Sequence, residues 1–297
     1  MTWPISRMRG PGSVIESRPA PAKPPEVEEA VDQFIHRPLA RPLVRLLVPT
    51  PITPNQVTLL SAVAGVVAAL LMAGSVDRPA WRVLAGLVLL GSVVLDCCDG
   101  QLARARGTSS TYGAILDGIA DYITGVSVGA AVGWYLVGLT GDARYWLLVL
   151  VGIASSAVHS ALFDHTKTRY IARVGQGYRE REEDLTQVAT ERDRAWREHR
   201  FRDALLLWLY FKYTSAQQAA LAVPAATDAV AYRKAHAWRM RTWTFLGVGT
   251  HFALGYVAMV LSRWWPLAPA GFLLLPATAM NLLLVALLQL DHRAARG

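Results

Sequence analysis

The sequence predicts an all-α membrane protein with six transmembrane helices. Of its 297 residues, 53% are hydrophobic, and the mean hydropathy is +0.28, which is high for a water-soluble domain. A helix needs roughly 20 mostly apolar residues to cross the hydrocarbon core of a bilayer. Six such stretches occur along the chain, at 56–74, 80–96, 114–139, 144–163, 242–262 and 267–290.

The basic residues predict how these helices are oriented. If the N-terminus is cytoplasmic, 26 of the 30 Lys and Arg residues lie in cytoplasmic segments, as the positive-inside rule requires. The other four lie outside or at outer helix ends: Arg78, Arg82, Arg144 and Arg263. We therefore expect a multi-pass protein of the plasma (inner) membrane with both termini in the cytoplasm.

Charge and cysteine content narrow the classes of function. The net charge of +8 fits attraction to anionic lipid headgroups, and no motif of interleaved aromatic and basic residues favours nucleic acid. Cys97 and Cys98 are the two cysteines of the chain. They are adjacent and fall on the predicted cytoplasmic side, which excludes a disulfide framework.

Two segments precede the first predicted helix. Residues 1–25 are rich in Pro, Arg and Ser and predict a disordered tail. Over residues 27–48, apolar side chains recur at helical spacing and basic side chains occupy the other positions. This pattern predicts an amphipathic juxtamembrane helix in the headgroup region, and we expect Pro38 and Pro42 to kink it.

A second extramembrane region separates the fourth and fifth predicted helices. Residues 164–241 are predicted to form a cytoplasmic helical insertion, with a charge-dense stretch at 179–202. The apolar run 204–211 is too short to span a bilayer, so we expect it at the membrane interface or against a partner helix. A solvated insertion is the simpler interpretation, and a regulatory or acceptor-binding lid is the alternative.

Small and polar residues inside the apolar stretches predict contacts between helices. Glycines recur at spacings of seven and four along the third stretch, which favours close packing within the bundle or across a dimer. These glycines are Gly118, Gly125, Gly129 and Gly133. For His159, we expect a hydrogen bond inside the bundle rather than metal ligation.

Four aspartates lie at the edges of the second and third apolar stretches. Asp96 and Asp99 are three positions apart and Asp117 and Asp121 are four apart, so each pair projects from one face of its helix. Ionised carboxylates near hydrocarbon are costly unless they are neutralised, and clustered oxygen ligands suit Mg²⁺ or Mn²⁺. Two facing pairs would hold two divalent ions, as sites of phosphoryl displacement do.

The aspartates are open to two other interpretations. They could pair with Arg104, Arg106 and other cytoplasmic bases, but two arginines do not compensate four carboxylates. They could also mark the path of an ion-coupled membrane transporter. The carboxylates of a transporter are expected near the bilayer midplane rather than at one edge.

These aspartates belong to a longer pattern that resembles, without a departure, the signature of the CDP-alcohol phosphotransferase (CDP-alcohol phosphatidyltransferase) family. The pattern is Asp96-x2-Asp99-Gly100-x2-Ala103-Arg104-x8-Gly113-x3-Asp117-x3-Asp121. The six apolar stretches, the amphipathic segment before them and the Pro54-Asn55-x2-Thr58 sequence are similar to the family as well. The resemblance covers about 27–174 and 240–290 and leaves the insertion outside.

The resemblance implies a metal-dependent transferase of substituted phosphate groups in phospholipid biosynthesis. An acceptor hydroxyl attacks the β-phosphorus of a CDP-linked donor, such as CDP-diacylglycerol, and CMP leaves. Two divalent ions, Mg²⁺ or Mn²⁺, are implied at Asp96, Asp99, Asp117 and Asp121, and Asp121 is implied as the catalytic base. A homodimer among membrane lipids is implied too.

The same resemblance implies which residues contact the cytidine diphosphate. On the motif these are Gly100, Arg104 and Ser110, and at the head of the first apolar stretch Asn55 and Thr58 lie nearby. The planar cation of Arg104 suits a phosphate group.

The identity of the acceptor depends on weaker signals. Family acceptors include inositol phosphate, inositol and glycerol 3-phosphate, and a phosphorylated acceptor needs several cations nearby. Possible acceptor-binding residues are Lys167, Arg169, Arg173 and Arg239, although the positive-inside rule alone also accounts for them. The proline-flanked entrance before the first apolar stretch favours the inositol-phosphate-like branch. A soluble phosphodiester synthase and a CDP-choline/ethanolamine-type phosphotransferase are the alternatives.

Overall fold

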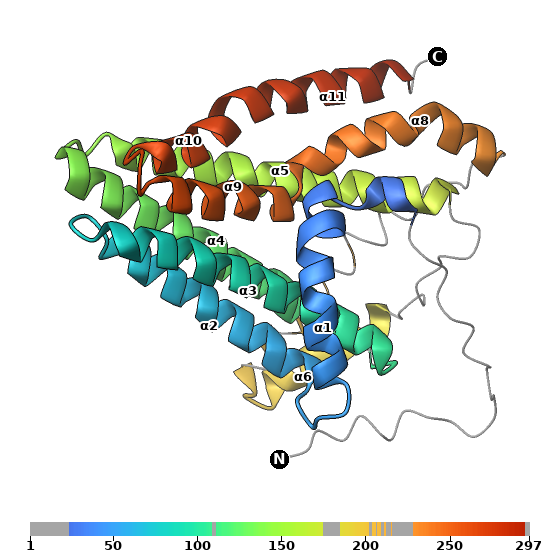
Figure 1. Cartoon of the computed structure of the whole chain (residues 1–297). Coiled ribbons are helices and arrows are strands. Elements are labelled where there is room, and N and C mark those ends of the chain that lie inside the picture. Colours follow the sequence, from blue (N-terminus) through green and yellow to red (C-terminus); the bar gives the residue numbers. More distant parts are fainter. Residues whose placement is uncertain are drawn as a thin grey trace.

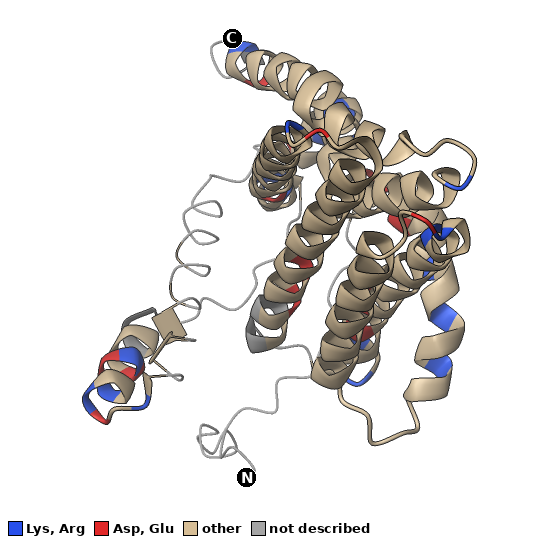
Figure 2. Ribbon diagram, turned by 90° about the vertical axis from the view of Figure 1, so that its left-hand side faces the viewer, with Lys and Arg blue, Asp and Glu red and all other residues tan. Residues whose placement is uncertain are grey.

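The computed structural model describes residues 24–108, 111–174, 185–201, 204–205, 207–208, 211, 215 and 228–294. Within these residues every regular element is a helix. Five helices are long and apolar enough to cross a membrane, and one bent pair of helices brings the number to six. Figure 2 shows that the long helices carry few charged side chains along most of their length. The predicted all-α membrane fold is confirmed.

Helix α2 (Pro54–Ala73) packs against both α3 (Pro79–Ala105) and α4 (Thr111–Thr140), as Figure 1 shows. It begins with a capping box formed by Thr53 and Gln56, which satisfies two amides at the start of the helix. Helix α4 can approach closely because Gly65 has no side chain. A Cβ at that position would lie 2.5 Å from the side chain of Thr124.

Two helices are longer than the apolar stretches that predicted them. Helix α3 continues past the predicted end at 96 to Ala105, and α5 (Tyr145–Val174) continues past 163. Both extensions bury an apolar side chain, Leu102 in α3 and Ile171 in α5. Hydropathy alone places the ends too early, because these extensions carry charged residues on their other faces.

Glycines on α4 divide into two groups. A Cβ at Gly133 would lie 2.5 Å from the side chain of Val149, and one at Gly129 would overlap that of Ile153, both on α5. Gly118 and Gly125 have no described atom within 4 Å of such a Cβ. The prediction of close packing within the bundle is confirmed for Gly129 and Gly133 and not for the other two.

The fifth predicted span, 242–262, is wrong as a single continuous helix. Helix α8 (Ala229–Trp243) and the 3-10 turn η4 (Thr244–Leu246) end at Gly247, and α9 (Val248–Leu261) begins there at an angle of 45°. Gly247 has extended backbone, with φ −77° and ψ 160°, so the helical hydrogen bonds stop. Apolar residues on both sides hide this break from a hydropathy profile.

The last predicted span is one helix of changing pitch. It comprises α10 (Ala268–Leu275), the π-helical turn η5 (Pro276–Met280) and α11 (Asn281–Ala294). Pro276 has no N–H to donate, and a π-helical turn is one way in which a helix accommodates such a residue.

A buried polar chain links three of the helices. His159 on α5 contacts His251 on α9 at 3.2 Å and Asn281 on α11 at 3.0 Å. His251 also contacts the carbonyl of Gly247 at 2.7 Å. The expected hydrogen bonding of His159 inside the bundle is confirmed.

The N-terminal segment folds over the end of the bundle that carries the aspartates. It comprises the 3-10 turn η2 (Pro25–Val27), the π-helical turn η3 (Asp32–His36) and α1 (Arg37–Leu47). Figure 1 shows α1 crossing the ends of α2 and α3. Helix α1 buries Ala40 and Val44 in a cluster with α3 and leaves Leu39, Leu43 and Leu46 exposed, as is Phe34 of η3.

The two prolines of this segment fit the helix differently. Pro38 lies in the first turn of α1, directly after the π-helical turn, and Pro42 lies inside α1. The placement of this helix in the headgroup region stays a prediction. The tail 1–23 and much of the apolar run 204–211 lie outside the described residues. Within the insertion, α6 spans Leu185–Arg197.

Candidate active site

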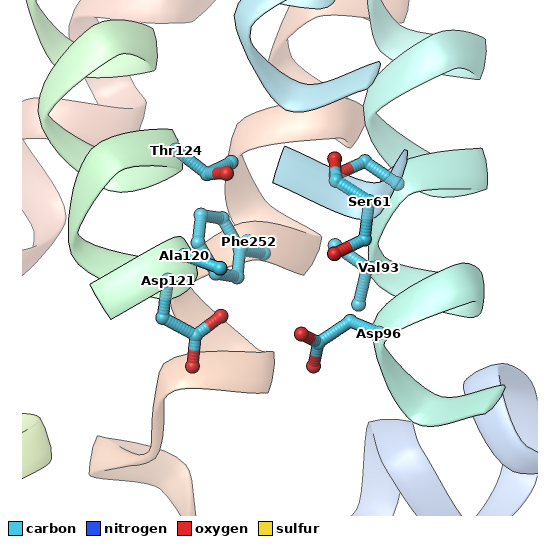
Figure 3. Close-up of a pocket in the computed structure, with 8 residues that line it drawn as sticks. Ser61, Val93, Asp96, Ala120, Asp121, Thr124 and Phe252 are labelled. Carbon is cyan, nitrogen blue, oxygen red and sulfur yellow. The ribbon is translucent and has the colours of Figure 1, made fainter. Parts of the chain in front are cut away.

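Two acidic helix faces meet between α3 and α4. Carboxylate oxygens of Asp96, Asp99 and Asp117 all lie within 4.8 Å of one another, and the side chains of Asp96 and Asp117 are hydrogen-bonded. Figure 3 shows the carboxylate of Asp121 facing that of Asp96 across a small pocket. The structure therefore brings together all four aspartates that the sequence pattern singles out.

Helix α2 forms one side of the pocket. The hydroxyl of Thr58 donates a hydrogen bond to Asp99, and both residues are buried, with 3% and 6% of their surface exposed. Ser61 lines the pocket one turn further along, and its carbonyl accepts a hydrogen bond from Ser92 at 2.7 Å. Small hydroxyl residues thus let α2 and α3 approach closely beside the aspartates.

Thr124 and Phe252 complete the pocket wall, from α4 and α9. The sequence alone does not single out these two residues or Ser61. For Ser61 and Thr124, the available signal is a hydroxyl side chain about one helical turn from Thr58 or from Asp121. Such residues are common in membrane helices, so only the packing of the helices shows which of them face the site.

Of the residues expected to contact the donor, Asn55 and Thr58 lie on α2 and Gly100 and Arg104 on α3. The guanidinium of Arg104 lies over Gly100: a Cβ there would be 3.4 Å from its Nη1. Arg104 also interacts electrostatically with Asp99 and Asp117. Asn55 is exposed in the first turn of α2. Ser110 lies outside the described residues.

A second acidic layer from the N-terminal segment lies behind the site. The buried Glu29 carboxylate accepts hydrogen bonds from the amides of Gly249 at 3.3 Å and Thr250 at 2.7 Å, so it caps the first turn of α9. Burial and the neighbouring carboxylate of Asp32 raise the pKa of Glu29 to about 7. The carboxylate of Glu29 also interacts electrostatically with the carboxylate of Asp121.

Glu29 is not among the site residues that the sequence pattern predicts. Its signal is a run of acids at Glu26, Glu28, Glu29 and Asp32, next to an apolar helical pattern. Glu29 explains the break in the fifth span. Its carboxylate occupies the space that a Cβ at Gly247 would need, and it satisfies amides that a continuous helix would pair with the preceding turn.

The four bases considered for the acceptor have different surroundings. Lys167 forms an ion pair with Asp164 at 2.8 Å and interacts electrostatically with Asp117. Arg173 donates to the hydroxyl of Tyr232 at 3.1 Å. Arg239 pairs with Asp291 on α11 at 3.4 Å, and Arg169 is exposed. Of the four, Lys167 has the clearest link to the aspartates.

The donor set fits a hard divalent cation. Three carboxylates that converge within a few ångströms repel one another and provide oxygen ligands without competing soft ligands. Arg104 and Lys167 supply two positive charges near four negative ones, so a deficit of positive charge remains. Mg²⁺ and Mn²⁺ prefer such carboxylate sites, and Mg²⁺ usually keeps several waters or substrate oxygens as further ligands.

Comparison with known proteins decides the family. The sequence profile of the CDP-alcohol phosphatidyltransferase family matches residues 51–179. A phosphatidylinositol phosphate synthase of Mycobacterium tuberculosis is 30% identical over 170 residues, which cover 57% of this chain and 74% of that protein. The chain belongs to the CDP-alcohol phosphatidyltransferase family. Its members are transferases of phospholipid biosynthesis that depend on divalent metal ions, so the transporter interpretation of the aspartates is set aside.

Two further relatives match shorter segments. A phosphatidylinositol phosphate synthase of Corynebacterium glutamicum is 35% identical over 100 residues, which cover 33% of this chain and 43% of that protein. A bifunctional IPC transferase and DIPP synthase of Rubrobacter xylanophilus is 45% identical over 91 residues, which cover 28% of this chain and 20% of that protein. The family profile, which matches residues 51–179, includes all four aspartates.

Proposed function

We propose that this protein transfers a phosphatidyl group from CDP-diacylglycerol to a hydroxyl of inositol phosphate and releases CMP. The observation that carries the proposal is the convergence of Asp96, Asp99, Asp117 and Asp121 between two apolar helices. Relatives named phosphatidylinositol phosphate synthase favour inositol phosphate over inositol and glycerol 3-phosphate as the acceptor.

The aspartates have distinct proposed roles. Asp96, Asp99 and Asp117 would hold one divalent ion, and Asp96, Asp117 and Asp121 would hold a second. When bound, the ions neutralise charge on the diphosphate. The hydroxyl of Thr58 holds Asp99 in place, because it donates a hydrogen bond to that carboxylate.

The proposed reaction is a single displacement at the β-phosphorus. A bond forms between the acceptor oxygen and this phosphorus, and the bond from the phosphorus to the bridging oxygen breaks, so that CMP leaves with the electron pair. The proton of the acceptor hydroxyl passes to the carboxylate of Asp121. Arg104 donates to the diphosphate, where negative charge develops.

The donor and acceptor approach the aspartates from the same end of the bundle. Gly100 lets the nucleotide lie close to the backbone of α3, and Asn55, Thr58 and Ser110 complete the donor contacts. Lys167 is the proposed first contact of the acceptor phosphate, since it already interacts with Asp117, and Arg169, Arg173 and Arg239 extend the positive surface. The active site and both termini face the cytoplasm in this proposal, and the protein is a homodimer.

The test is CMP release by the purified protein in detergent with Mg²⁺ or Mn²⁺ and CDP-diacylglycerol. We expect release with inositol phosphate, and we expect Asp121→Asn to lower it by about 10²–10⁴-fold without changing thermal unfolding. No release with any alcohol acceptor would overturn the proposal. Full activity of Asp121→Asn would overturn the assignment of the base.

A panel of acceptors separates the proposed reaction from its alternatives. The relative named as a bifunctional IPC transferase and DIPP synthase has the highest identity of the three over its matched segment, so a soluble CDP-alcohol donor belongs in the panel. CMP release with that donor, and none with CDP-diacylglycerol, would favour a soluble phosphodiester synthase. CMP release with diacylglycerol as acceptor and CDP-choline or CDP-ethanolamine as donor would favour a CDP-choline/ethanolamine-type phosphotransferase.

A further inference from the structure

An arginine outside the family signature holds the turn between α1 and α2. Nη1 of Arg106, at the end of α3, donates to the carbonyl of Ile52 at 2.5 Å. Its Nη2 lies 2.5 Å from the carbonyl of Leu47, 3.1 Å from that of Val48 and 2.7 Å from that of Thr50. One guanidinium therefore binds four backbone carbonyls of a single turn.

Besides Arg106, the turn is held by Thr50, whose amide and hydroxyl donate to the carbonyl of Leu47 at 3.0 and 2.7 Å. Pro49, Pro51 and Pro54 have no N–H groups, and the last carbonyls of α1 have no partners within that helix. A cation at the C-terminus of a helix also interacts favourably with the helix dipole. The planar fork of Arg106 matches several carbonyls at once, which the single ammonium of a lysine does not.

The position of this turn determines the position of the first turn of α2. The capping box at Thr53 starts the helix directly after the turn, and Asn55 and Thr58 follow. Thr58 is bound to Asp99 of α3. Asp99 and Arg106 are seven residues apart, which is two helical turns, so they lie on one face of α3. Helix α3 thus holds the start of α2 at two points, one on each side of Asn55.

We infer that Arg106 is a positioning residue for the CDP-linked donor. Arg106 fixes the start of α2 before the donor binds. Asn55 and Thr58 are then already in place to contact the nucleotide. This inference rests on the proposed role of those two residues in donor binding. Loss of the Arg106 hydrogen bonds adds the free-energy cost of ordering this turn to donor binding. It leaves the aspartates and the residues proposed to bind the acceptor in place.

The other end of α3 provides a matched control. Arg82 is buried and donates to the carbonyls of Ser75 at 3.2 Å, Val76 at 2.6 Å and Ser262 at 2.9 Å. It clamps the turn that follows α2, as Arg106 clamps the turn that precedes it. Arg82 lies roughly 20 Å along the helix from Asp96. Its substitution therefore tests the loss of arginine–carbonyl hydrogen bonds at a distance from the site.

The experiment compares Arg106→Gln, Arg106→Lys and Arg82→Gln in the full-length protein in detergent. We expect Arg106→Gln to raise the KM for CDP-diacylglycerol by about tenfold or more, which corresponds to roughly 1.4 kcal/mol, with kcat and the acceptor KM within about threefold. Arg106→Lys should give an intermediate donor KM. Arg82→Gln should lower the thermal midpoint and leave the donor KM unchanged.

Hydrogen exchange provides a readout that does not depend on activity. The amides of residues 47–57 should exchange faster in Arg106→Gln than in the wild type and in Arg82→Gln. An unchanged donor KM in Arg106→Gln, or an equal rise in Arg82→Gln, would overturn the inference. If the wild type releases no CMP with any acceptor, the proposed function fails. In that case unchanged exchange over 47–57 would also overturn the positional role of Arg106.

Discussion

Each aspartate of the site is placed among groups that determine what it can bind. Asp99 accepts a hydrogen bond from Thr58 and interacts with Arg104, Asp117 interacts with Lys167, and Asp121 faces Asp96. These partners orient the carboxylates but do not balance their charge. The family depends on divalent metal ions, and in the proposed function two such ions would supply the missing positive charge.

The aspartates could be predicted from the sequence because their spacing on two helices places them at one edge of the bundle. The contacts that remote segments make at or near the site could not be predicted. The bond from Thr58 to Asp99 depends on how α2 packs on α3, and the cap that Glu29 forms joins residues 220 positions apart. Nothing local to either sequence specifies such a contact.

An ion pair between the buried Glu26 and the half-exposed Arg233 anchors the N-terminal segment to α8. Glu26 accepts two hydrogen bonds from Arg233, at 2.6 and 2.8 Å, and one from Tyr170 at 2.8 Å. Burial opposes ionisation of Glu26, but these hydrogen bonds outweigh it, so its pKa lies below the ordinary 4.5. The pair should therefore stabilise the fold above about pH 4.5 and lose this effect as the pH falls through the lowered pKa.

We predict that Glu26→Gln lowers the thermal midpoint at about pH 7 and that its difference from the wild type shrinks below about pH 4.5. Glu198→Gln is the control, since Glu198 forms exposed pairs with Arg194 and Arg200, and such surface pairs contribute little. Thermal unfolding in detergent measures both. A Glu26→Gln deficit that is the same at both pH values would contradict the account.

Among the elements, α2 and α4 are the helices whose ends the sequence predicted best. Helices α2 and α4 begin and end within a few residues of the predicted stretches. The observed ends of α3 and α5 differ from the predicted ends because the extensions of these helices are amphipathic. The break at Gly247 was not predicted because it depends on the carboxylate of Glu29, a remote residue that caps α9. Hydropathy records composition, and these three features depend on packing.

The approach of α2 to α4 depends on Gly65. We predict that Gly65→Ala destabilises the protein by about 1–3 kcal/mol, because the new Cβ would lie 2.5 Å from the side chain of Thr124. Gly125→Ala on α4 is the control, since its Cβ would meet no described atom within 4 Å. Thermal unfolding of both variants provides the test. Equal midpoints would show that helix packing beside the pocket is looser than the structure indicates.

For the whole molecule, the plan of five or six membrane-spanning helices could be predicted from hydropathy, whereas the path of the N-terminal segment could not. That segment folds back over the site through Glu26, Glu29 and α1. Its sequence predicts an amphipathic helix. It does not show that Glu26 binds Arg233 of α8 or that Glu29 caps α9.

The orientation in the membrane is a property of the whole chain and can be tested by labelling. We predict that a cysteine at Asp142, in the exposed turn between α4 and α5, reacts with a membrane-impermeant thiol reagent in intact cells. A cysteine at His292, near the end of α11, should react only after the membrane is opened. Cys97 and Cys98 are first replaced by serine or alanine in both proteins. The opposite labelling pattern would reverse the proposed topology.

The central claim is that four aspartates from α3 and α4 hold two divalent ions. The most direct measurement is anomalous X-ray scattering from crystals soaked with Mn²⁺ and CDP-diacylglycerol. We expect two manganese peaks between Asp96, Asp99, Asp117 and Asp121, and a loss of occupancy in Asp96→Asn. Well-ordered crystals of the wild type with no manganese peak between these helices would contradict it.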